Sequence, residues 1–149
     1  MKPDAPRVFY GIIASTMRDI APEMRTPFGQ QSVGLLSMLM ALAAQDYDGA
    51  AARLAEENVA LSELLAKART VTTGPDLHER IDAALGEPAG RDLRVSALQK
   101  ENDRLRALLI DVHAAVEGMP AEAARAMNEA IWDEIRESTR RRHLERGGV

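Results

Sequence analysis

Hydrophobic side chains recur every three or four residues along most of this chain, which is the spacing of one face of an α-helix. Over 8–24, for example, Phe9, Ile13, Met17 and Ile20 fall on a single face. No stretch alternates apolar and polar residues with the Val, Ile and Thr content of a strand. We therefore predict an all-α fold, an antiparallel bundle of five to six helices forming a single domain over 1–149.

Turn-forming residues divide this pattern into helices. The predicted helices span 8–24, 28–45, 50–69, 76–85, 92–117 and 120–143. The loops predicted between them lie near 24–27, 46–49, 70–75, 86–91 and 118–120, where Gly, Pro, Asp or Thr gather, and 144–149 is expected to be a frayed tail. The helix over 92–117 stands out as long, about 39 Å at 1.5 Å per residue.

The helix over 28–45 carries apolar residues around its whole circumference. A helix of this kind is usually buried on all sides, so we expect it at the centre of the core. The residues expected to be buried there are Val33, Leu35, Leu36, Met38, Leu39, Met40 and Leu42.

Two segments 44 residues apart share a leucine pattern. Residues 54–65 and 98–109 both read L-x-x-E-N-x-x-L-x-x-L-L, with six identities in twelve positions. In heptad terms each copy has an Asn at position a, a residue type that fixes register and partner number in coiled coils. The pattern predicts these interface and register residues: Asn58, Leu61, Leu65, Asn102, Leu105 and Leu109.

The same leucines also suit the interior of a bundle. Leu64 and Leu108 fall at position g, and the wider stripe that they create favours bundle helices over a two-stranded zipper. The two segments can run parallel, with Asn58 and Asn102 level, or antiparallel. Buried Asn side chains need hydrogen-bond partners, and each other is the obvious choice.

Composition excludes several classes of protein. The chain has 149 residues and no Cys, so a disulfide framework, a thiolate metal site and a Cys nucleophile are ruled out. Its net charge of −4 gives no overall attraction to nucleic acid or anionic lipid. The N-terminus lacks the pattern of a secretory signal, and the apolar stretch over 33–44 is too short for a bilayer, which needs about 20 residues. We expect a cytoplasmic protein without a membrane partner.

Candidate chemistry is sparse. His113 and Glu117 stand four residues apart on one predicted helix and form the candidate ligand site. A metal site needs three or four ligands, and no second pair accompanies them, so we predict no metal and no cofactor. No nucleophile elbow and no phosphate-binding glycine loop occurs, so no catalytic residue is assigned.

The last predicted helix ends in a basic stretch: Arg136, Arg140, Arg141, Arg142 and Arg146. Positive charge at a helix C-terminus complements the helix dipole, which explains this stretch without a ligand. Interleaved aromatic residues are missing, so nucleic-acid binding is not favoured.

The segments 32–36 (SVGLL) and 105–113 (LRALLIDVH) resemble those of a bacterial family of small helical proteins of uncharacterised function. Its members are often encoded beside acyl-CoA dehydrogenases and aminoglycoside-phosphotransferase-like kinases. The resemblance implies an accessory role in acyl-CoA or hydroxy-acid metabolism and brings no catalytic residue. The leading hypothesis is a non-catalytic interaction protein, either a helical-bundle homo-oligomer or an accessory subunit of a metabolic enzyme. The alternative is a ligand-binding protein or enzyme with a polar site near His113 and Glu117.

Overall fold

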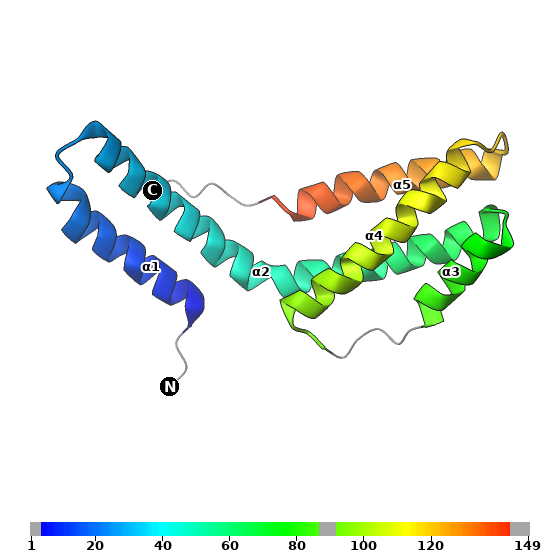
Figure 1. Cartoon of the computed structure of the whole chain (residues 1–149), viewed down its shortest axis with the longest axis horizontal. Coiled ribbons are helices and arrows are strands. Elements are labelled where there is room, and N and C mark those ends of the chain that lie inside the picture. Colours follow the sequence, from blue (N-terminus) through cyan, green and yellow to red (C-terminus); the bar gives the residue numbers. More distant parts are fainter. Residues whose placement is uncertain (1–3, 87–91, 144–149) are drawn as a thin grey trace. The chain divides into compact units, whose positions relative to one another are not determined.

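The computed structural model describes residues 4–86 and 92–143, and these are helical apart from short connections, which confirms the all-α fold (Figure 1). The helices are α1 (Ala5–Ser15), α2 (Pro27–Val71), α3 (Pro75–Gly86), α4 (Val95–Glu117) and α5 (Glu122–Arg141). Between α1 and α2 lie a π-helical turn, η1 (Thr16–Ile20), and a 3₁₀ turn, η2 (Ala21–Glu23).

The turn predicted at 46–49 is wrong, because α2 continues through it as a single helix of 45 residues. The only helix breaker in that segment is Gly49, and a lone Gly costs a helix about 1 kcal/mol relative to Ala. The alanines on either side, at 43–44 and 50–52, favour helix and offset that cost. The longest helix is therefore α2, at about 68 Å, rather than the predicted helix over 92–117.

The other predicted boundaries are close to the observed ones. The helix predicted over 92–117 is α4, which has 23 residues and begins three residues later than expected. The breaks between helices fall at or next to the predicted loops 24–27, 70–75 and 118–120. Residues 87–91 of the predicted loop and the predicted tail at 144–149 lie outside the described residues.

The chain forms two compact units, one up to Ala50 and one spanning Ala51–Arg142. In the first, α1 and the early part of α2 form a hairpin. Val33, Ser37 and Ala44 are buried on the inner side of α2. The prediction that this part of α2 is buried all round is wrong, since Leu35, Leu36, Met38 and Leu39 are all exposed. Among the described residues of the hairpin, α1 with its two short turns covers a single side of α2, and one neighbouring helix can bury only one face of another.

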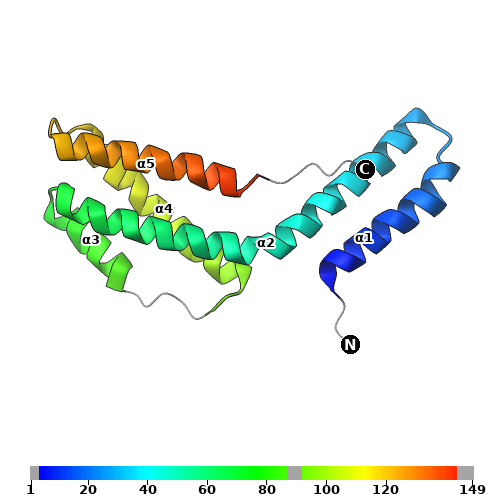
Figure 2. The same cartoon turned by 180° about the vertical axis from the view of Figure 1, so that it is seen from behind.

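The second unit is an up-down-up-down bundle made from α2 after Ala50, α3, α4 and α5 (Figure 2). Residue pairs along the helices define the directions. At the junction of α2 and α3, Arg69 contacts Asp82 and Thr72 contacts His78, and on α4 and α5, Arg106 contacts Ser138 while His113 contacts Asn128. These pairs run antiparallel, as expected for neighbours joined by short loops.

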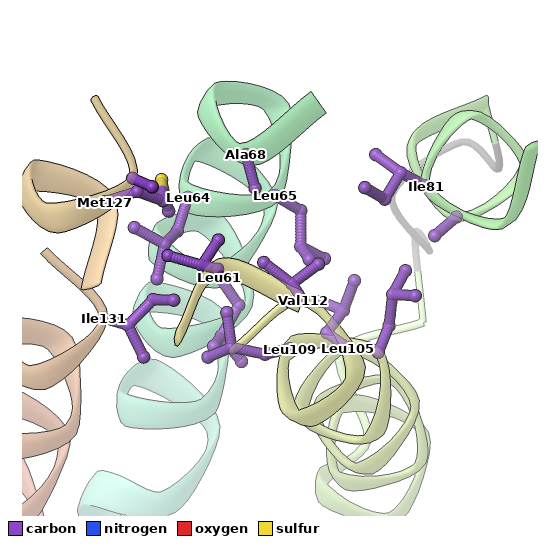
Figure 3. Close-up of a cluster of buried hydrophobic side chains, with 14 residues drawn as sticks. Leu61, Leu64, Leu65, Ala68, Ile81, Leu105, Leu109, Val112, Met127 and Ile131 are labelled. Carbon is purple, nitrogen blue, oxygen red and sulfur yellow. The ribbon is translucent and has the colours of Figure 1, made fainter. Parts of the chain in front are cut away.

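Leucine, isoleucine, valine and methionine side chains from all four helices fill the centre of this bundle (Figure 3). Ile81 of α3, Val112 of α4 and Ile131 of α5 are fully buried there. Burying such side chains contributes about 1.5–3 kcal/mol each, so this cluster is the main source of stability of the second unit.

Candidate functional site

The two leucine segments pack against each other within one chain. They are level, because Asn102 Nδ2 donates to Asn58 Oδ1 at 2.9 Å and Asn58 Nδ2 donates to the Leu98 carbonyl at 3.0 Å. They run parallel, because α3 is antiparallel to both helices: it is antiparallel to α2, and on its other side Arg80 contacts Asp111 of α4 while the Ala84 carbonyl accepts from Arg104. The predicted pairing of the two carboxamides is thus confirmed, and the parallel alternative is the one observed. Residues at equivalent positions of the two segments, 44 apart in the sequence, are therefore neighbours in space, as Asn58 and Asn102 are.

The predicted interface leucines lie in the interior of the second unit. The four side chains are at most 7% exposed: Leu61, Leu65, Leu105 and Leu109. Their apolar surface is covered by helices of the same chain (Figure 3). A surface for another protein must therefore be sought elsewhere.

Beside the Asn pair lies a buried carboxylate, Glu57, whose side chain is 0% exposed. Arg142 binds it with two hydrogen bonds, from Nε to Oε1 at 3.0 Å and from Nη2 to Oε2 at 2.8 Å. Arg106 Nη2 donates to Oε2 at 3.0 Å, and Asn102 Nδ2 donates to the same oxygen at 3.2 Å. We call Glu57, Asn58, Asn102, Arg106 and Arg142 the polar core cluster.

The two guanidiniums control the ionisation of Glu57. Burial by itself would raise the pKa of this carboxyl, but the hydrogen bonds from Arg142 and Arg106, together with their charges, outweigh it and hold the pKa below its usual range. Arg106 also donates to Asn102 Oδ1 at 2.8 Å and to Ser138 Oγ at 2.7 Å. The cluster thus ties α2, α4 and α5 together through bonded polar groups.

The clustering of Glu57, Arg106 and Arg142 was not predicted from the sequence, in which Arg142 counted only as part of the basic stretch. One signal was present: Glu57 precedes Leu64 by seven residues and so shares the heptad position that widens the apolar stripe. A charged residue on an apolar face needs a buried partner of opposite sign. Nothing in the sequence points to Arg142 as that partner, because it stands 85 residues away.

The basic stretch at the end of α5 is largely neutralised within the chain. Arg141 pairs with Glu134, and both side chains are mostly buried. Arg136 pairs with Asp133, and Arg140 with Glu137, on the helix surface. Together with the pairing of Arg142, these contacts account for the charges of the stretch up to Arg142, while Arg146 lies outside the described residues.

Of the candidate ligand residues on α4, His113 faces α5, and Glu117 lies one turn further along the same helix. His113 Nε2 donates to Asn128 Oδ1 at 2.7 Å, and its ring meets Trp132 edge-on with the ring centroids 5.4 Å apart. Glu117 Oε1 lies 3.6 Å from the same nitrogen, beyond hydrogen-bond distance, and its side chain is 61% exposed. The ring of His113 is thus held in contacts that join α4 to α5.

A groove of about 860 Å³ runs along α2 and α4 on the side where α3 lies. The short α3 has 12 residues and α4 has 23, so α3 leaves part of α2 and α4 uncovered. Residues from all three helices line the groove, among them Asn58, Val59, Ser62, Leu85, Leu98 and Arg104. Its walls combine apolar side chains with the edge of the polar core cluster.

The hairpin exposes a second apolar surface on the outer side of α2. Its members are separated by four and three residues in turn, the spacing of a heptad seam. They are Phe28, Ser32, Leu35, Leu39 and Leu42, which we call the outer seam. Phe28 is 80% exposed, and Leu35 and Leu39 are 53% and 52% exposed. By helix geometry the outer seam lies roughly opposite the inner residues Val33, Ser37 and Ala44.

Comparison with protein-family models, with curated proteins and with solved structures found no match. Within the described ranges 4–86 and 92–143, there is no group of three or more His, Asp or Glu side chains that could hold a metal ion. Within the same ranges, every helix falls short of the length and apolarity needed to cross a bilayer.

Proposed function

We propose that this chain is a non-catalytic interaction protein whose outer seam is the surface that another protein covers. The observation that supports this is the exposure of Phe28, Leu35 and Leu39 on one helix face. Proteins that expose a contiguous apolar patch of this kind commonly use it to bind a partner.

Charge distribution supports the same proposal. Residues 28–45 contain no Asp, Glu, Lys or Arg at all, although charged residues make up 28% of the chain. Depletion of charge at the centre of an apolar patch distinguishes interface cores from ordinary surface.

In this proposal the polar core cluster stabilises the fold and is not the binding surface. Its carboxylate and both guanidiniums are paired with each other, and the ring of His113 is paired with Asn128. The accessory-subunit form of the proposal, which the family resemblance implies, needs only the outer seam and a complementary surface on an enzyme.

The experiment compares the wild-type chain with Leu35→Ser/Leu39→Ser. Chemical cross-linking in extracts of the native host, followed by mass spectrometry, reports what lies against the seam, and sedimentation of the purified chain reports its own association. The matched control is Val59→Ser/Ile110→Ser, two exposed apolar residues outside the hairpin. We expect the seam variant alone to lose its association while its helix content is unchanged. Identical association of all three chains would refute the proposal.

A further inference from the structure

We infer that the occupant of the outer seam is a second copy of this chain, lying antiparallel to the first across a two-fold axis. This inference rests on the proposed function and goes beyond it by naming the partner and its orientation. It draws on the heptad spacing of the outer seam, the absence of charge along it and the charges at its two ends.

The outer seam has the sequence features of a helix that pairs with another helix. Leu35, Leu39 and Leu42 follow the spacing of four and three residues that keeps side chains along one line of contact. Phe28 and Ser32 extend this line toward the start of α2. A surface built in this way is complementary to another helix with the same spacing, and a second copy supplies one.

The ends of the outer seam carry opposite charges. Arg25 precedes Phe28, and Asp46 follows Leu42 at the next four-residue step of the outer seam. Both are exposed. A carboxylate accepts several hydrogen bonds, so contacts that an aspartate already makes within its own chain leave room for another donor.

These charges select the direction of pairing. In a parallel pair, Arg25 would meet Arg25, and Asp46 would meet Asp46. In an antiparallel pair whose axis passes near Leu35 and Leu39, Arg25 of each copy lies near Asp46 of the other. A two-fold axis makes this exchange of opposite charges occur twice. Like charges placed together disfavour the parallel pair.

The size of the outer seam suits a helix pair of ordinary length. From Phe28 to Leu42 it spans 14 steps along α2, or about 21 Å. Over this length α1 covers the opposite side of α2, so two hairpins brought together place their α2 helices at the centre. The product is a four-helix arrangement in which each α2 is covered on both sides, as its apolar circumference requires.

The test uses single-cysteine variants, because the chain contains no Cys of its own. Arg25→Cys and Asp46→Cys are purified separately, mixed and treated with a short bismaleimide. An antiparallel pair yields mainly the mixed product that joins the two variants. A parallel pair yields mainly products that join like variants, and that result overturns the inference.

Sedimentation equilibrium of the full chain supplies the second readout. We expect a wild-type dimer, an increase of at least about 100-fold in the dissociation constant of Leu35→Ser/Leu39→Ser, and an unchanged dimer in Val59→Ser/Ile110→Ser. A dimer that is broken only by the control pair would place the interface elsewhere and overturn the inference, while an interaction role for the chain would stand.

The remaining outcomes separate the inference from the proposed function. A chain that stays monomeric at 100 µM, yet cross-links to one enzyme only when the outer seam is intact, overturns the second copy and keeps the interaction role. Flotation with phosphatidylcholine–phosphatidylglycerol vesicles that depends on Leu35 and Leu39 would identify lipid as the occupant and overturn it too. A monomer with neither behaviour defeats both proposals.

Discussion

Replacing Glu57 by Gln tests the polar core cluster most directly. The substitution keeps the shape of the side chain and one acceptor oxygen, but it removes the charge that Arg106 and Arg142 share. Hydrogen bonds to charged groups contribute about 1.5–3 kcal/mol each, and the side chain of Arg142 is 45% exposed and can regain hydration. Allowing for that recovery, we expect Glu57→Gln to lower the free energy of unfolding by about 3 kcal/mol at pH 7.

The effect should depend on pH in a defined direction. The pKa of Glu57 is lower in the folded chain than the ordinary value of 4.5, so ionisation of this carboxyl stabilises the folded state relative to the unfolded state. The stability that it contributes is fully present above about pH 4.5 and is lost as the pH falls through the folded-state pKa. Urea unfolding followed by circular dichroism at several pH values should show the two chains converging in acid.

The control is Glu56→Gln, which makes the same chemical change on the same helix at an exposed position. We expect it to change the free energy of unfolding by less than about 0.5 kcal/mol. If Glu57→Gln matched that control at pH 7, or if its deficit persisted undiminished in acid, the assignment of Glu57 as an ionised and net stabilising centre would be refuted.

Three further predictions are tested by urea unfolding. Ser37 is buried, and among the described residues its hydroxyl has no hydrogen-bond partner, so Ser37→Ala should stabilise the hairpin by about 1 kcal/mol. A loss of stability would contradict this interpretation. Gly74 has a φ of 126°, which side-chain-bearing residues rarely adopt, so Gly74→Ala should lower the free energy of unfolding by about 1–2 kcal/mol. The control is Gly86→Ala, because among the described residues a Cβ added at Gly86 would meet no atom within 4 Å beyond its chain neighbours and the backbone of its own helix. In a double-mutant cycle, Asn58→Ala and Asn102→Ala should couple by about 1 kcal/mol, and strict additivity would contradict their hydrogen bond.

Much of the second unit followed from periodicity. Helices pack through apolar faces that local spacing reveals, and a repeated pattern with a polar residue at the same position restricts how two such faces align. The pairing of Asn58 with Asn102 was predictable for this reason, since a carboxamide that leaves water needs a complementary group at the same level. The end of α4 and the start of α5 were found to within a few residues because Gly118 and Pro120 act locally.

Two features required the tertiary structure. Periodicity identifies the faces of a helix but not which of them other helices cover, so the apolar circumference of α2 suggested complete burial, and only the fold left Leu35 and Leu39 open. Similarly, the partner of Glu57 is Arg142, which lies 85 residues away in the sequence, and only the folded structure brings the two side chains together. Local spacing determines what each helix can bury, whereas coverage and charge pairing arise when distant segments meet.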